Sequence, residues 1–118
     1  MGERVTIPLH RIAHSRAGDK GNRLNLSLIC YAPELYATIA EQVTDERVAA
    51  IFAARRPSRV MRYELPKLAA FNFVLDDVLE GGVNASLGLD GHGKSLSFVL
   101  LAATVELDAV LAVRFAKG

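Results

Sequence analysis

An alternation of apolar side chains between residues 23 and 30 constrains the fold more than any other feature of the sequence. The apolar positions are Leu24, Leu26, Leu28 and Cys30. Because successive side chains of a strand point to opposite faces, the segment predicts a strand that is buried on one face only. The sheet that contains it is therefore expected to have helices packed on one side.

Similar patterns predict three further strands and four helices. Strands are expected over residues 5–9, 61–65 and 83–89, and helices over 33–43, 44–52, 68–79 and 95–107. Thr44 can cap the second helix, which opens with two acidic residues. The order β-β-α-α-β-α-β-α predicts a two-layer α/β (α+β) sandwich, ferredoxin-like, with about four strands and helices on one face.

Size and charge narrow the classes of function. The 118 residues predict a single domain, 1–118, and the net charge of +1 gives no electrostatic case for nucleic acid or an anionic membrane. No signal peptide is visible and the longest apolar stretch, 98–105, is too short to span a bilayer, so we expect a cytoplasmic protein. One cysteine excludes an internal disulfide, and no metal-ligand spacing is present, so no metal and no cofactor are predicted.

Residues 88–95, GLDGHGKS, fit the phosphate-loop pattern G-x-x-x-x-G-K-[ST]. In a true phosphate loop, Lys94 would neutralise phosphates and Ser95 would bind magnesium. Such enzymes build a parallel sheet that continues after the loop, whereas only about two dozen residues follow Lys94. The alternatives are a tight turn in which Asp90 caps the next helix, and an anion-binding turn without hydrolysis.

Residues 13–22, AHSRAGDKGN, form the densest cluster of reactive residue types, and the sequence predicts a polar loop here. His14 can transfer protons near neutral pH, and Arg16 can hold a carboxylate or phosphate through two hydrogen bonds. The ligand-binding candidates in this segment are Arg16, Asp19, Lys20 and Asn22. The alternative is a solvated hairpin loop whose charges cancel.

Four further candidates for ligand binding lie later in the chain. Asn72 falls on the apolar stripe of the helix expected over 68–79, so its amide should point inward or into a cleft, where it needs hydrogen-bond partners. It either ties that helix to a neighbouring loop or binds a ligand. Ser86, Asp90 and Lys94 belong to the strand and turn that precede the last predicted helix.

AHSRAGDKGN also resembles the signature of the small domain found at the C-terminus of acyclic terpene utilisation (AtuA-like) proteins, a family that includes short stand-alone forms. The resemblance continues through ELY at 34–36, YELP at 63–66, NFVL at 72–75 and GGVNASLGLDGHGKSL at 81–96. It covers nearly the whole chain up to about residue 101. The last segment of the family looks like S-L-x-x-D-x-x-G-K, in which position 88 is typically not glycine. Because Gly88 supplies the first fixed letter of the phosphate-loop pattern, that match is interpreted as accidental.

The resemblance implies a ferredoxin-like domain that associates with a larger AtuA-like partner in the catabolism of branched or terpenoid acids as CoA thioesters. It assigns no reaction and no catalytic residues. The leading hypothesis is a self-associating accessory or binding subunit whose polar residues line a pocket for a small anion or acyl-CoA. The apolar last helix favours the self-association.

Two other hypotheses remain open at this stage. One is a small enzyme that acts on an acyl or carboxylate substrate, with His14 as the acid/base and with Arg16 and Lys94 holding the anion. The other is nucleotide binding at residues 88–95, which the short remainder of the chain disfavours.

Overall fold

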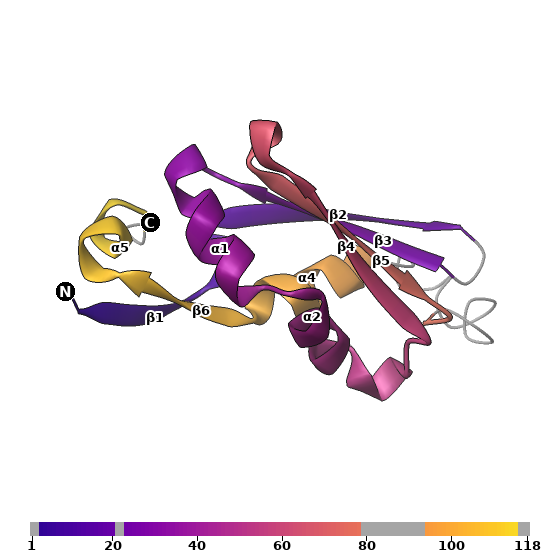
Figure 1. The fold of residues 1–118 in the computed structure, drawn as a ribbon. Coiled ribbons are helices and arrows are strands. Elements are labelled where there is room, and N and C mark those ends of the chain that lie inside the picture. Colours follow the sequence, from indigo (N-terminus) through magenta and orange to yellow (C-terminus); the bar gives the residue numbers. More distant parts are fainter. Residues whose placement is uncertain (1–2, 21–22, 79–93, 116–118) are drawn as a thin grey trace.

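A computed structural model describes residues 3–20, 23–78 and 94–115, with the backbone alone for residues 19, 20, 94 and 95 (Figure 1). The strands are β1 (Arg4–Pro8), β2 (Ala13–Lys20), β3 (Arg23–Cys30), β4 (Arg59–Leu65), β5 (Ala70–Asp76) and β6 (Thr104–Asp108). The α-helices are α1 (Tyr36–Gln42), α2 (Asp45–Ile51), α4 (Lys94–Ala102) and α5 (Ala109–Phe115). Short 3-10 turns cover Leu9–Arg11, Pro33–Leu35, Ala53–Arg55 and Pro66–Leu68.

The main sheet has the strand order β2-β3-β5-β4, and each of its pairings within the described residues is antiparallel. Since α1 and α2 connect β3 to β4 and β5 lies between these two strands, the centre of the fold is a split β-α-β unit. β2, which precedes this unit, takes the position beside β3, while β6 pairs with β1 in a separate two-stranded sheet. The predicted ferredoxin-like α/β sandwich is confirmed, with a small second sheet added.

The helices α1, α2 and α4 lie on one side of the main sheet, as Figure 1 shows. The side chains that β3 and β5 direct towards them are fully buried: Leu24, Leu26, Leu28, Phe71, Phe73 and Leu75. This inner face forms the main part of the hydrophobic core, so the half-buried strand predicted over residues 23–30 is confirmed. The opposite side of the sheet carries no helix in the described part of the chain.

Polar side chains cap α2 and fix α1 to the main sheet. Thr44 Oγ1 accepts a hydrogen bond from the backbone N–H of Arg47 (3.1 Å), so the predicted cap of α2 is confirmed. Arg62 Nη1 on β4 donates to the carbonyls of Ala40 (2.7 Å) and Val43 (3.0 Å), which satisfies acceptors at the end of α1. The terminal carbonyls of α1 are thereby tied to the main sheet.

The helix expected over residues 68–79 is wrong, because residues 70–76 form β5 instead. Phe71 and Leu75 fit both a helical stripe and a strand alternation, and pairing with β3 on one side and β4 on the other decides for the strand. Ala69 also has a φ of 51°, which a right-handed helix does not allow. Asn72 therefore points away from Phe71 and Phe73 and lies on the helix-free side of the sheet.

The polar loop expected within residues 13–22 is wrong over residues 13–20, which form β2. Small and charged residues have weak strand propensity, yet β2 pairs with the strongly apolar β3 along its whole length, from Ala13 opposite Cys30 to Lys20 opposite Arg23. Pairing with a well-defined neighbour thus overrides local propensity. The consequence is that His14 and Arg16 stand on a rigid strand.

The last helix is shorter than expected and the element order differs accordingly, because α4 ends at Ala102 and β6 follows. Val105 and Leu107 are buried while their neighbours in β6 are exposed, which is a strand alternation. Leu96 and Leu100 of α4 are buried as expected, but Phe98 is 70% exposed. The strand expected over 83–89 and the turn over 90–93 lie outside the described residues.

Candidate functional site

The side of the main sheet opposite the helices brings together polar residues from all four strands. Arg16 of β2 lies opposite Ser27 of β3. On the other side of β3, Asn72 of β5 lies opposite Ser27, and Tyr63 of β4 lies opposite Asn72. We call this side the open face and define it by these four residues and their same-side neighbours His14, Arg23, Asn25, Ile29, Arg59, Met61, Leu65, Ala70, Val74 and Asp76. The polar row crosses the whole width of the sheet.

Hydrogen bonds hold two parts of this row in place. Ser27 Oγ accepts from the backbone N–H of Arg16 (3.1 Å), and Asn72 Nδ2 donates to Asn25 Oδ1 (3.2 Å). The second bond crosses from β5 to β3 and fixes both side-chain amides. The polar groups are therefore positioned before any ligand arrives, which lowers the entropic cost of binding.

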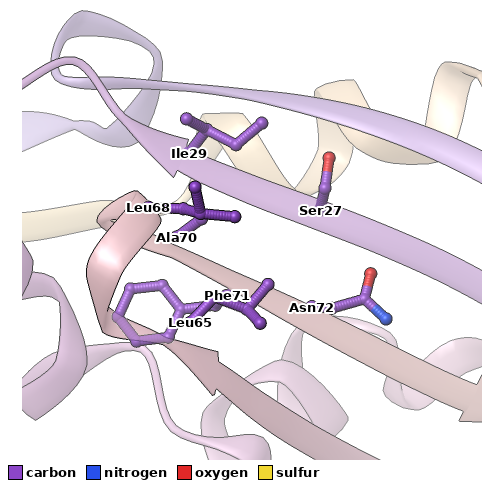
Figure 2. Close-up of a pocket in the computed structure, with 7 residues that line it drawn as sticks. All are labelled: Ser27, Ile29, Leu65, Leu68, Ala70, Phe71 and Asn72. Carbon is purple, nitrogen blue, oxygen red and sulfur yellow. The ribbon is translucent and has the colours of Figure 1, made fainter.

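An apolar hollow of about 370 Å³ lies on one side of the polar row. Figure 2 shows Ser27 and Asn72 at one end of it and the aliphatic side chains at the other. The lining residues are Ser27, Ile29, Leu65, Leu68, Ala70, Phe71 and Asn72. Its volume is at the lower end of the range for small-molecule sites, and the mixture of apolar walls with a few polar groups is typical of them.

A second, polar hollow of about 210 Å³ lies on the other side of the row. It is lined by Arg23, Asn25, Arg59, Met61, Tyr63, Val74 and Asp76. The Arg23 Nε donates to Asp76 Oδ1 at 2.7 Å, so one of its two arginines is paired with its one carboxylate. The Asn25–Asn72 hydrogen bond joins a residue of this hollow to a residue of the apolar one.

The described side chains of the open face carry a net positive charge. Arg16, Arg23 and Arg59 face a single carboxylate, that of Asp76. Because the whole chain has a net charge of only +1, this excess is local. A surface of this kind favours an anionic ligand or an acidic partner surface.

His14 lies at the corner of the open face next to the apolar hollow. It is exposed, it is opposite Ile29 in the strand register, and its ring stacks on Tyr31 with a centroid distance of 5.6 Å. The neighbouring Cys30 points to the other side, into the core, where burial raises the pKa of its thiol to about 11. Cys30 is therefore a neutral core residue rather than a nucleophile.

The sequence-predicted residues divide into three groups. Arg16 and Asn72 lie in one row, with His14 in the next, although Asn72 lies on a strand rather than on the predicted helix. Asp19 and Lys20 are the last residues of β2, and Lys94 is the first residue of α4. The structure describes only the backbone of these three residues. The remaining candidates Asn22, Ser86 and Asp90 lie outside the described residues.

Sequence reasoning missed several residues of the open face. Asn25, Ser27, Arg59 and Tyr63 were not among the predicted ligand-binding residues. The signal was present, since the polar positions of a strand with one buried face must share the other face. Within the described residues, no group of three or more His, Cys, Asp or Glu side chains is arranged to hold a metal ion.

A comparison with protein families finds a match to the AtuA ferredoxin-like domain over residues 7–106, from β1 into β6. The chain belongs to this family. The match confirms the resemblance carried by AHSRAGDKGN and the later segments, and it places the whole open face inside the AtuA ferredoxin-like domain. No curated protein and no solved structure matches the chain significantly.

Two further observations concern alternatives to a binding domain. Phosphate-loop hydrolases build parallel sheets, whereas the strand pairings described in this AtuA ferredoxin-like domain are antiparallel, which argues against nucleotide hydrolysis. The segment GLDGHG itself, 88–93, lies outside the described residues. In the part of the chain that the structure covers, no helix has the length and apolar character needed to cross a bilayer.

Proposed function

We propose that this AtuA ferredoxin-like domain is an accessory or binding subunit that works with a larger AtuA-like protein in the catabolism of branched or terpenoid acyl-CoA compounds. Its open face would form one wall of a pocket, and the partner would supply the opposite wall. This role is supported by the resemblance to the small domains that stand at the C-terminus of larger AtuA-like proteins.

The observation that carries this proposal is the polar row Arg16–Ser27–Asn72–Tyr63 beside an apolar hollow, on a sheet face without a described helix. Exposed apolar side chains border it, with Leu68 at 68% and Tyr63 at 49% exposure. Aromatic and arginine side chains are the residues most often important for binding energy in interfaces. The hollow is shallow, so a second wall would exclude the water that now reaches it.

The proposal is tested by mixing the purified chain with the larger AtuA-like protein encoded nearest to it and measuring the complex by calorimetry. Tyr63→Glu places a carboxylate on the open face, at its β4 edge, and is expected to weaken the complex at least tenfold. Glu41→Lys, an exposed change on α1 on the helix side, is the matched control and should leave binding unchanged. Equal affinity of both variants and the wild type would refute the open face as the contact.

Self-association is a separate part of the proposal. Phe98 on α4 and Val110 and Val113 on α5 are 70%, 74% and 69% exposed. Large apolar side chains exposed on two helices are typical of subunit contacts. We propose that a second copy of the chain covers them, which leaves the open face free for the larger partner.

A small enzyme is the second candidate function, and the position of His14 favours it. His14 lies opposite Ile29, which lines the apolar hollow, so a substrate acyl group in the hollow would lie near the strand position of an acid/base group. The reaction would be tested with purified complex and a panel of acyl-CoA compounds. Turnover that persists in His14→Ala at the wild-type rate would exclude His14 as the acid/base.

A further inference from the structure

The two hollows of the open face differ in chemistry and lie in line along β5. Ala70, Phe71 and Asn72 contribute to the apolar hollow, and Val74 and Asp76 contribute to the polar one. Four residues of strand separate their centres, which corresponds to roughly 13 Å. A single small molecule can therefore reach both, provided that one end is apolar and the other polar.

The charge at the polar hollow indicates the sign of that polar end. Asp76 is already paired with Arg23 at 2.7 Å, whereas the Arg59 guanidinium has no acceptor within the described residues. Arg59 is exposed and lies opposite Asp76 in the register, at the end of the same hollow. An anionic group placed here would gain a cationic partner without displacing an existing ion pair.

The apolar hollow indicates the other end. Its walls are apolar except for Ser27 and Asn72, which belong to the polar row and lie at one end (Figure 2). Leu68, 68% exposed, would bury most of its side chain against an apolar ligand. Removing that surface from water supplies the favourable free energy for binding an aliphatic tail.

We infer that the open face binds a small amphipathic anion, an aliphatic chain ending in a carboxylate or phosphate, with the tail in the apolar hollow and the anionic group at Arg59. The Asn25–Asn72 amide pair lies between the two ends and offers hydrogen bonds to a polar group in the middle of the ligand. The inference rests on the proposed function, in which the open face is the binding surface. It adds the class of ligand and says which end of the ligand lies in which hollow.

The test is a titration of the ¹⁵N-labelled chain, followed by backbone amide shifts, with octanoate, octyl phosphate, 1-octanol and butyrate as separate probes. Octanoate or octyl phosphate should shift amides of β3, β4 and β5 at both hollows and bind more tightly than 1-octanol and butyrate. Binding by both anions supports a shared anion site, and binding by one identifies carboxylate or phosphate as the preferred group. Anions that bind no better than 1-octanol, or shift amides elsewhere, overturn the inference.

Variants separate the two ends of the site. Arg59→Gln should weaken the anionic probes about three- to fivefold, as expected for an exposed ion pair, and leave 1-octanol unchanged. Arg4→Gln removes the same charge from β1, outside the main sheet, and is the control. Leu68→Ser should weaken octanoate and 1-octanol alike, on the order of tenfold. If octanoate fails while the complex with the larger AtuA-like protein still depends on Tyr63, the ligand inference falls and the proposed function stands.

Discussion

Asn72 donates a hydrogen bond of 3.2 Å to Asn25 across the β3–β5 pair, on the side of the sheet that faces away from the helices. The two residues lie far apart in the sequence and were expected in different kinds of element. Their bond fixes the centre of the open face between an apolar and a polar hollow. Its proposed contribution to binding can be separated from its contribution to folding.

Replacing Asn72 by alanine is expected to lower the free energy of unfolding by no more than about 1 kcal/mol, because both amides are part-buried and water can replace the lost partner. The same change should weaken the complex with the larger AtuA-like protein. Urea unfolding of Asn72→Ala, Asn25→Ala and the double variant gives the coupling energy of the pair. Zero coupling would mean that the hydrogen bond does not form in solution.

Arg62→Met is expected to destabilise the protein by about 1.5–3 kcal/mol, since it removes charged hydrogen bonds to the carbonyls of Ala40 and Val43 while keeping much of the side-chain volume. The Arg62 side chain is only 17% exposed, so water replaces these bonds poorly. Chemical denaturation measures the loss. Arg59→Met, on the exposed end of the same strand, is the control and should change stability by a few tenths of a kcal/mol.

The Cys30 thiol binds its proton more tightly in the folded protein, because burial raises its pKa to about 11. This preference for the protonated thiol therefore stabilises the folded protein fully below the pKa of the unfolded thiol. The stabilisation is lost as the pH rises towards 11. The stability difference between wild type and Cys30→Ala should shrink between pH 8 and pH 10.5 in urea unfolding. The pKa of Tyr36 is raised by desolvation, then by Glu64 and also by Cys30, so the repulsion between the two ionised groups in the wild type adds to the same loss of stability at high pH.

A constant difference across that range would show that Cys30 is accessible to solvent. Thiol-labelling reagents provide an independent check at pH 8. The native protein should react at least a hundredfold more slowly than the urea-unfolded chain, since the thiol is buried and protonated.

Under the proposed self-association, Phe98→Ser with Val113→Ser should give a monomer while leaving the melting temperature within a few degrees, because both side chains are largely exposed in the single chain. Light scattering coupled to gel filtration measures the mass. Val5→Ser, a less exposed position on β1, is the control. A wild-type chain that is already monomeric at high concentration would contradict self-association.

Much of the fold could be predicted from local patterns because those patterns agree with the tertiary structure. The alternation around Leu26 marks a strand with one buried face, and the Thr44 cap marks the start of α2. β4 is found within two residues of the expected start and at the expected end, where Pro66 cannot continue the sheet.

The errors came where local and tertiary preferences conflict. Phe71 and Leu75 fit a helical spacing, and only the strands on either side make β5 a strand. The glycine, aspartate and serine of β2 have weak strand propensity, and pairing with β3 overrides it. The pattern predicts a helix through β6 because the apolar residues of β6 continue those of α4. In the structure, Gln42 instead accepts from the backbone N–H of Glu106 (2.8 Å) and donates to its carbonyl (2.7 Å).

The candidate site was predicted only in part, because strand pairing brings its residues together. Arg16 and Asn72 were selected for their chemistry, and the family resemblance supported the segments that contain them. Arg16 and Asn72 lie in one row only because of the register of β2, β3 and β5. No local sequence pattern specifies that register. Residues such as Tyr63 become visible as neighbours only once that register is known.

The central claim, that the open face is the binding surface, is tested most directly by cysteine protection. Because native Cys30 is buried, single cysteines can be introduced as Arg16→Cys and Tyr63→Cys on the open face and as Glu41→Cys and Ala50→Cys on the helix side. Their labelling rates are compared with and without the larger AtuA-like protein. The account predicts that the partner slows labelling at least tenfold at Arg16→Cys and Tyr63→Cys and leaves the other two unchanged. Protection confined to Glu41→Cys and Ala50→Cys would contradict it.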